Sequence, residues 1–164
     1  MEVASYDICQ KAMEHCSLVE VLSRCTAFCY IEDGDRSLYE DKDIFLGKFD
    51  PEFGFIRCYV PTAVAKRTTP PFHELIPAPS IDEILEAFNS LASFGVKGEL
   101  MMRLDTCAGK YMATFFRLRH SRDGQGSFHA SVSRDAEDSP ADMLLELLID
   151  VAYKCLDPMT GEQK

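Results

Sequence analysis

The sequence lacks a surplus of positive charge. It carries 17 Lys and Arg side chains against 27 Asp and Glu, so its formal net charge is −10. Residues 1–79 hold 13 acidic and 8 basic side chains and residues 80–164 hold 14 and 9, so each part nets −5. Such a charge disfavours non-specific binding to nucleic acid or to an anionic membrane. The even spread also excludes an acidic tail or a basic arm.

Long apolar runs are missing too. No run approaches the roughly 20 apolar residues of a membrane-spanning helix. The first ten residues, "MEVASYDICQ", have neither the basic region nor the apolar centre of a signal peptide. We therefore expect a cytoplasmic protein without contact to a membrane, in which the seven cysteines are mostly reduced and buried.

Sequence motifs for catalysis are absent. The chain contains no glycine-rich phosphate loop, no G-x-S-x-G and no H-E-x-x-H. Its four histidines stand outside any recognisable motif: His15, His73, His120 and His129. The sequence predicts a protein that is not an enzyme and that needs no cofactor.

One cysteine pair has a spacing that zinc ligands use. Cys25 and Cys29 lie four residues apart, with His15 and Cys16 earlier in the chain. A second close pair of ligands is missing, however. In a β-strand Cys25 and Cys29 point to the same face, so buried thiols explain them and no metal site is expected.

Size and composition favour one globular domain. The chain has 164 residues, of which 46% are hydrophobic and 27% charged. Five prolines fall within residues 61–79, which predicts an extended, proline-rich connector. Each side of this connector alone would have a thin core, so we expect residues 1–164 to form a single domain.

The N-terminal part predicts a helix and two strands. Apolar residues recur at helical spacing over residues 5–22. The stretches 24–32 and 53–60 are rich in strand-forming residues. Between them, residues 37–52 are strongly charged, and we expect a long loop there with at most a short strand.

Two helix starts are well marked. Ser80 and Glu83 have the spacing of a capping box, in which the Ser hydroxyl accepts one backbone N–H and the Glu carboxylate accepts another. A second helix begins with Ser139 as N-cap and Pro140 at its first position. On this helix the residues Leu144, Leu147, Leu148, Val151 and Cys155 form a stripe that should be buried.

The opposite side of the last helix is acidic. Asp142, Glu146 and Asp150 recur at intervals of four residues. We expect them to form a solvated face, on which Asp150 and Lys154 make a helical ion pair.

Between the two helices lie three strand-like runs, at 98–105, 110–119 and 127–133. Their connections carry the residues of hairpin turns, which predicts an antiparallel meander. The expected fold class is therefore α+β. Its antiparallel sheet combines the three-stranded C-terminal meander with one or two N-terminal strands, and the helices pack mainly on one face.

Strand alternation divides the meander into two faces. We assign to the core face Leu100, Met102, Leu104, Met112, Thr114, Phe116, Leu118, Phe128, Ala130 and Val132. The other face then collects Glu99, Met101, Arg103, Asp105, Tyr111, Ala113, Phe115, Arg117, Arg119, Ser127, His129, Ser131 and Ser133.

The candidate binding residues stand on this second face. They are Met101, Tyr111 and Phe115 at the centre, ringed by Arg103, Arg117, Arg119 and His129. The first helix or a second copy of the chain can cover such a surface, which makes a homodimer an expectation. Aromatic and arginine side chains on an open sheet can equally stack unpaired bases of single-stranded nucleic acid.

Two segments carry a resemblance to a known group. "FHELIPAPSIDEILEAF" and "DSPADMLLELLIDVAY", with the meander between them, resemble uncharacterised small proteins from prophage and mobile-element regions of gut bacteria. Those proteins show an "IPAP(S/T)" segment, a few strands and a closing helix. This chain has "ADMLLELL" where the closing helix of the group starts "ADAMA". The resemblance implies an accessory protein of a mobile element and carries over no catalytic residue.

Together these observations predict a non-enzymatic protein-interaction module, encoded by a phage or mobile element, with an unidentified protein partner. The first alternative is a single-stranded nucleic-acid binder that uses the face around Tyr111 and Phe115. The second alternative is an enzyme of unrecognised type, with a pocket that brings a histidine or cysteine together with a carboxylate.

Overall fold

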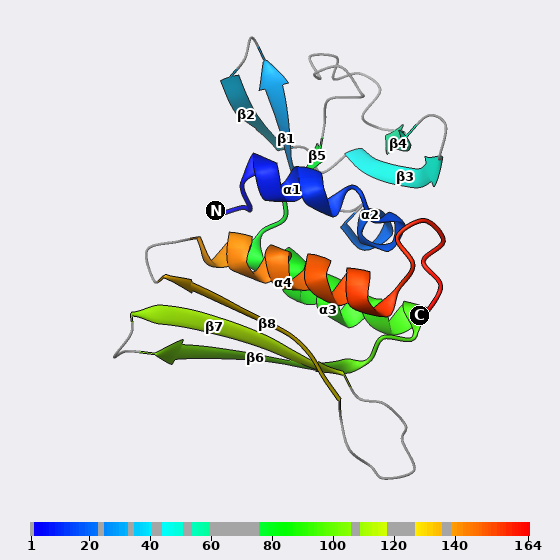
Figure 1. Cartoon of the computed structure of the whole chain (residues 1–164). Coiled ribbons are helices and arrows are strands. Elements are labelled where there is room, and N and C mark those ends of the chain that lie inside the picture. Colours follow the sequence, from blue (N-terminus) through cyan, green and yellow to red (C-terminus); the bar gives the residue numbers. More distant parts are fainter. Residues whose placement is uncertain are drawn as a thin grey trace.

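The computed structural model has the α+β composition expected from the sequence (Figure 1). It describes residues 2–22, 25–32, 35–40, 44–50, 54–59, 76–105, 109–117, 127–135 and 139–164. The described helices are α1 (Tyr6–Ala12), α2 (Cys16–Leu22), α3 (Ile81–Ser90), the 3₁₀ helix η3 (Leu91–Phe94) and α4 (Pro140–Cys155). The described strands are β1 (Ala27–Glu32), β2 (Asp35–Glu40), β3 (Ile44–Asp50), β4 (Gly54–Tyr59), β5 (Ile76–Pro77), β6 (Gly98–Asp105), β7 (Lys110–Arg117) and β8 (Ser127–Asp135).

Helix α4 lies at the centre of the molecule. It contacts β7 and β8 on one side and α1, α2 and α3 on the others, and Figure 1 shows α3 and α4 between the C-terminal sheet and the pair α1–α2. The predicted buried stripe is confirmed, and burial extends well beyond it. The fully buried residues of α4 are Ala141, Leu144, Leu145, Leu147, Leu148, Val151, Ala152 and Cys155. Surrounded in this way, α4 forms the core on which the other layers pack.

The strands form separate sheets. Their orders are β2-β1-β5, β3-β4 and β6-β7-β8, with antiparallel pairing throughout. The expectation that N-terminal strands join the meander in one sheet is therefore wrong. The expected loop at 37–52 is also wrong, because β2 returns along β1 as a hairpin and β3 pairs with β4. Pairing with a neighbouring strand overrides the high charge of this stretch.

The helix expected over residues 5–22 is divided in two. Helix α1 ends at Ala12 and α2 begins at Cys16, with His15 just before it. The Nδ1 atom of His15 accepts the backbone N–H of Ser17 at 3.3 Å. A side chain that accepts the N–H of the second helical residue is an N-cap. His15 thus starts α2 as a new helix with its own N-terminus.

The segment Ile76–Ser80 ties three parts of the chain together. Strand β5 pairs with β1, and the N–H of Ala78 donates to the carbonyl of Ala27 at 2.9 Å. On its other side, Pro79 accepts the N–H of Ala4 at 3.0 Å. The segment therefore joins β1 to the N-terminal residues and leads directly into α3.

Glu83 completes this junction. The predicted capping box is confirmed: the N–H of Glu83 donates to the Ser80 hydroxyl at 3.3 Å, and Glu83 Oε1 accepts the N–H of Ser80 at 3.1 Å. The second oxygen, Oε2, accepts the N–H of Thr26 at 2.9 Å, immediately before β1. One carboxylate thus fixes both the start of α3 and the approach to β1.

A second carboxylate joins the starts of α1 and α4. Ser139 caps α4 as predicted, with Pro140 following it. Asp142 Oδ1 accepts the N–H of Ser5 at 2.6 Å, and its Oδ2 accepts the Ser5 hydroxyl at 2.8 Å. The expectation that the acidic side of α4 is entirely solvated is therefore wrong at Asp142. The predicted ion pair between Asp150 and Lys154 is present at 3.0 Å.

Among the described residues, no helix is long and apolar enough to cross a membrane. Most of the proline-rich connector, residues 61–75, lies outside the described part of the chain. The single domain over residues 1–164 stays a prediction.

Replacing Glu83 by Ala should destabilise the fold by about 1–3 kcal/mol, because the backbone N–H groups of Ser80 and Thr26 both lose their acceptor. The neighbouring Asp82→Ala is the matched control. Asp82 is exposed and interacts with the α3 N-terminus through the helix dipole, so its loss should cost about 0.5 kcal/mol. Urea unfolding followed by circular dichroism measures both. Equal midpoints for the two variants would contradict the role given to Glu83.

Candidate functional site

The register of the C-terminal sheet decides which side chains share a face. Directly opposed residues of an antiparallel pair lie on the same face. Leu100 pairs with Phe115 and Met102 pairs with Ala113. The prediction placed Leu100 and Met102 on the same face as Met112, Thr114 and Phe116. The register places them with Phe115 and Ala113 instead, so this part of the prediction is wrong.

Phe115 belongs to the core. Its side chain is 2% exposed and stacks on Phe88 of α3 with 5.7 Å between ring centroids. Ala113, on the same face of β7, is fully buried. The prediction that Phe115 is at the centre of an exposed binding surface is therefore wrong. The small side chain of Ala113 and the ring of Phe115 form the inner face of the sheet against α3 and α4.

Arg117 also points inward. It is 6% exposed, and its Nη2 donates to Oε1 of Gln163 at 3.2 Å. Gln163 in turn donates from Nε2 to the carbonyl of Phe94 at 3.1 Å. The C-terminal segment thus folds back and uses Arg117 as a structural anchor. The prediction that Arg117 rims a binding surface is wrong.

The remaining candidate residues divide into two groups. Met101 is 56% exposed, and Arg103 is exposed as well. Tyr111 lies on β7 and His129 on β8, but their side chains are outside the described part of the structure, as is Arg119. Of the seven predicted site residues, Met101 and Arg103 are thus the ones seen at the surface.

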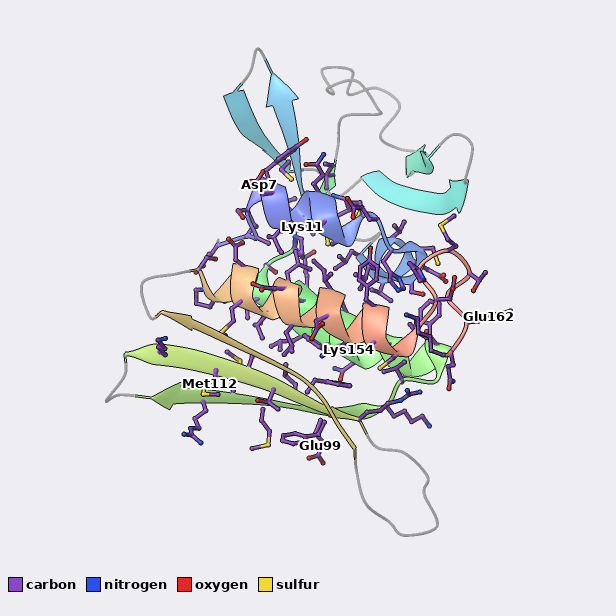
Figure 2. The ribbon with its side chains drawn as sticks, viewed as in Figure 1. Asp7, Lys11, Glu99, Met112, Lys154 and Glu162 are labelled. Carbon is purple, nitrogen blue, oxygen red and sulfur yellow. The ribbon has the colours of Figure 1, made fainter. Side chains whose placement is uncertain are left out.

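The other face of the sheet is what we call the outer sheet face. Its described side chains are Glu99, Met101 and Arg103 on β6 and Lys110, Met112, Thr114 and Phe116 on β7, since the register places these residues on one face. Glu99 projects from the sheet on the side away from α3 and α4 (Figure 2). Strand alternation alone had assigned Met112, Thr114 and Phe116 to the core, and the register places them on the outer sheet face instead.

This surface combines apolar and charged side chains. Met101 is 56% exposed and is among the exposed large apolar residues of the described chain. Glu99 and Arg103 flank Met101 at two residues on either side and are both exposed. An apolar centre with charged neighbours on a sheet can bind another protein surface.

A cavity of about 310 Å³ lies between α2 and α3. It is lined by Glu20, Val21, Cys25, Glu83, Glu86, Ser90, Ser93 and Phe94. Burial and the Glu83 carboxylate raise the pKa of the Cys25 thiol well above its usual value. Glu83 already accepts two backbone N–H groups. The cavity therefore contains a cysteine and a carboxylate, yet the thiol stays protonated and is a poor nucleophile.

The structure brings Cys29 together with Cys9, a pairing that the sequence did not indicate. Hydrogen bonding to Cys29, together with burial, raises the pKa of the Cys9 thiol. Cys9 Sγ donates to the carbonyl of Ala4, and Cys29 Sγ donates to that of Ile76, each at 3.5 Å. As expected for buried thiols, Cys9, Cys25 and Cys29 all belong to the core. No group of three or more His, Cys, Asp or Glu side chains that could hold a metal ion occurs in the ranges that the structure describes.

His15 has a structural role. Its Nε2 lies 3.2 Å from the carbonyl oxygen of Ala152 and 3.3 Å from that of Leu156, so it donates to the C-terminal end of α4. Its Nδ1 accepts the Ser17 N–H. This neutral tautomer caps two helices at once, and burial lowers the pKa of His15 below its usual value of 6.5. His15 is therefore held neutral and is not positioned as a general base.

The chain was compared with family models, with curated proteins and with solved structures, and none of them matches it. The site therefore has to be interpreted from its own geometry.

Phe115→Ala should lower the free energy of unfolding by about 3–5 kcal/mol, because it removes a buried ring that stacks on Phe88. Met101→Ala on the outer sheet face should change it by about 0.5 kcal/mol or less. Chemical unfolding of the two variants measures the difference. A larger loss for Met101→Ala than for Phe115→Ala would reverse the assignment of the two faces.

The stability of the fold should fall as the pH drops below 6.5. In the unfolded chain His15 takes up a proton near that pH, whereas its depressed pKa in the folded protein keeps it neutral, so protons favour unfolding. The stabilisation is fully present above 6.5 and is lost as the pH falls toward the folded pKa. In His15→Asn, which can still cap α2 but does not titrate, the midpoint of urea unfolding should vary less between pH 7.5 and 5.5. An equal pH dependence in both proteins would refute this account.

Proposed function

We propose that this chain is a non-enzymatic protein-interaction module that binds a partner protein through the outer sheet face. The observation that carries the proposal is the exposed Met101 on β6, flanked by Glu99 and Arg103 on the face that α3 and α4 leave open. We further propose that it acts in the bacterial cytoplasm as an accessory protein of a phage or mobile element, which rests on the sequence resemblance.

The arrangement of the sheet supports this function. We propose that the helices pack mainly on one face of the three-stranded meander, where Ala113 and Phe115 are buried. Two layers of helices then secure the inner face, so the outer face can change its contacts without disturbing the core. Methionine suits such a surface because its flexible, polarisable side chain adapts to the shape of a partner.

The charge of the chain favours a partner with a basic surface. A net charge of −10 attracts a positively charged protein and speeds their encounter. Around the apolar centre, Glu99 and Arg103 supply charges of both signs, which fix the orientation of a bound surface more than its affinity. The expected contact on the partner is therefore an apolar patch within a generally basic region.

The nucleic-acid alternative has less support. It used Phe115 and Arg117 among its base-stacking aromatic and arginine side chains, and both are buried. Without phosphate contacts an acidic chain has little affinity for a nucleic-acid backbone. Among the described β6 and β7 side chains, the outer sheet face keeps Arg103 and Lys110 as cations, and the register places Lys110 opposite Asp105.

Met101→Lys and Met112→Lys should each reduce partner binding by at least about tenfold, since a charge then occupies the apolar centre of the interface. Met159→Lys is the matched control, because Met159 is 67% exposed on the turn after α4. Proteins captured from a bacterial lysate by the wild type and the variants are quantified by mass spectrometry. The affinity of the enriched protein is then measured by calorimetry.

Equal capture by all four proteins would overturn the assignment of the surface. Salt-sensitive binding of the wild type to a fluorescent oligothymidylate that is lost in Arg103→Glu, without any change in protein capture, would favour the nucleic-acid alternative instead.

A further inference from the structure

Strand β6 is an edge of its sheet. It pairs with β7 on one side, and no strand in the described ranges pairs with its other side. It is eight residues long, contains no proline, and exposes Met101 and Met102 at its centre. An edge with these properties is a template for pairing with another strand, because its outward N–H and C=O groups have no ladder partner.

Symmetry restricts how two copies of β6 can pair. In an antiparallel pair around a two-fold axis, each residue opposes one on the same face of the joined sheet. Side chains alternate between the two faces along a strand, so two residues that oppose each other must be an even number of positions apart. The two-fold axis therefore lies beside one residue, and that residue opposes the same residue of the second copy. The charges on β6 and the length of the paired stretch distinguish the remaining choices, because centring on Leu104 would also oppose Arg103 to Asp105 but would pair only residues 103–105 of the two strands.

Centring on Met101 brings opposite charges together. Glu99 then opposes Arg103 of the second copy, and the two-fold axis repeats this contact, while Leu100 opposes Met102 on the other face. Centring on Met102 would oppose Glu99 to Asp105, and centring on Arg103 would oppose that arginine to itself. Centring on Leu100 would oppose Glu99 to Met101 and forms no ion pair between strand residues.

We propose that the chain forms a two-fold dimer through its β6 edges, paired antiparallel with Met101 opposite Met101 and Glu99 opposite Arg103. The two three-stranded sheets then form one continuous sheet, and the outer sheet faces of both copies form one surface across the axis. The inference rests on the proposed function, because it names a second copy of the chain as the first partner of this region.

Charge exchange tests the register. Glu99→Arg places two arginines opposite each other at both symmetry-related positions, and Arg103→Glu does the same with two glutamates. Each single variant should dimerise at least about tenfold more weakly than the wild type, since attraction becomes repulsion at two cross-strand pairs. Sedimentation equilibrium over a range of concentrations measures the dissociation constant.

Mixing the two variants is the decisive experiment. In a mixed dimer every arginine faces a glutamate, so equimolar E99R and R103E should recover the wild-type dissociation constant, as should the double variant in one chain. Controls with the same charge changes are Glu14→Arg and Lys11→Glu, which lie on the exposed side of the N-terminal helical region and should leave dimerisation unchanged. Circular dichroism establishes that each variant is folded.

A wild-type protein that stays monomeric to about 0.5 mM, a concentration at which even a millimolar dimer would be detected, overturns the inference. So does a dimer that survives both single exchanges, or a mixture that fails to associate. Met112→Lys separates the two proposals, because it alters the outer sheet face one strand away from the β6 edge. If Met112→Lys is folded and dimerises but no longer captures the partner, both the dimer and the proposed function are supported. If the wild type is monomeric and still captures the partner, the dimer proposal alone is overturned.

Discussion

The carboxylate of Glu83 is the contact on which the arrangement of the chain depends. It accepts the N–H of Ser80 and the N–H of Thr26, which are 54 residues apart in sequence (80 − 26). The segment Ile76–Ser80 runs beside it between β1 and the N-terminal residues. A rigid, proline-containing lead-in directs the backbone, and the carboxylate then fixes where α3 starts relative to β1. Because α3 carries Phe88 to Phe115, this junction also positions the inner face of the meander.

Local signals in the sequence predicted the local structure well. The Ser80–Glu83 capping box and the Ser139 N-cap are short-range features, in which the interacting groups lie three residues apart. The division between α1 and α2 was missed because His15 is not a usual capping residue. Its role depends on the carbonyls of Ala152 and Leu156, which reach it through the tertiary fold. Likewise, Asp142 appeared to be a solvated helix residue until α1 was placed against it.

The faces of the meander could not be read from alternation because β7 is ambiguous. In "KYMATFFR" both alternating sets contain an aromatic and an apolar residue, so neither period-two pattern is clearly polar. What decides the matter is non-local: Phe88 receives Phe115, and Gln163 receives Arg117. An arginine on the inner face would ordinarily argue against burial, and here the C-terminal segment satisfies it. Met101 and Arg103 were predicted to lie at the surface, and both are exposed on β6.

The contacts between the N-terminal segment and α4 have a consequence for the order of folding. Glu2 accepts the Ser139 hydroxyl, Ser5 donates to Asp142, and His15 caps α4, each across 137 residues of sequence. Helices α1 and α2 have seven residues each, which is too short for independent stability in water. During synthesis these contacts therefore form after α4 has been made, whereas the contacts of the first segment with Ile76–Ser80 and α3 can form earlier. The apolar side chains of the first segment that pack on α4 stay uncovered until that late step, so the two ends of the described fold close last.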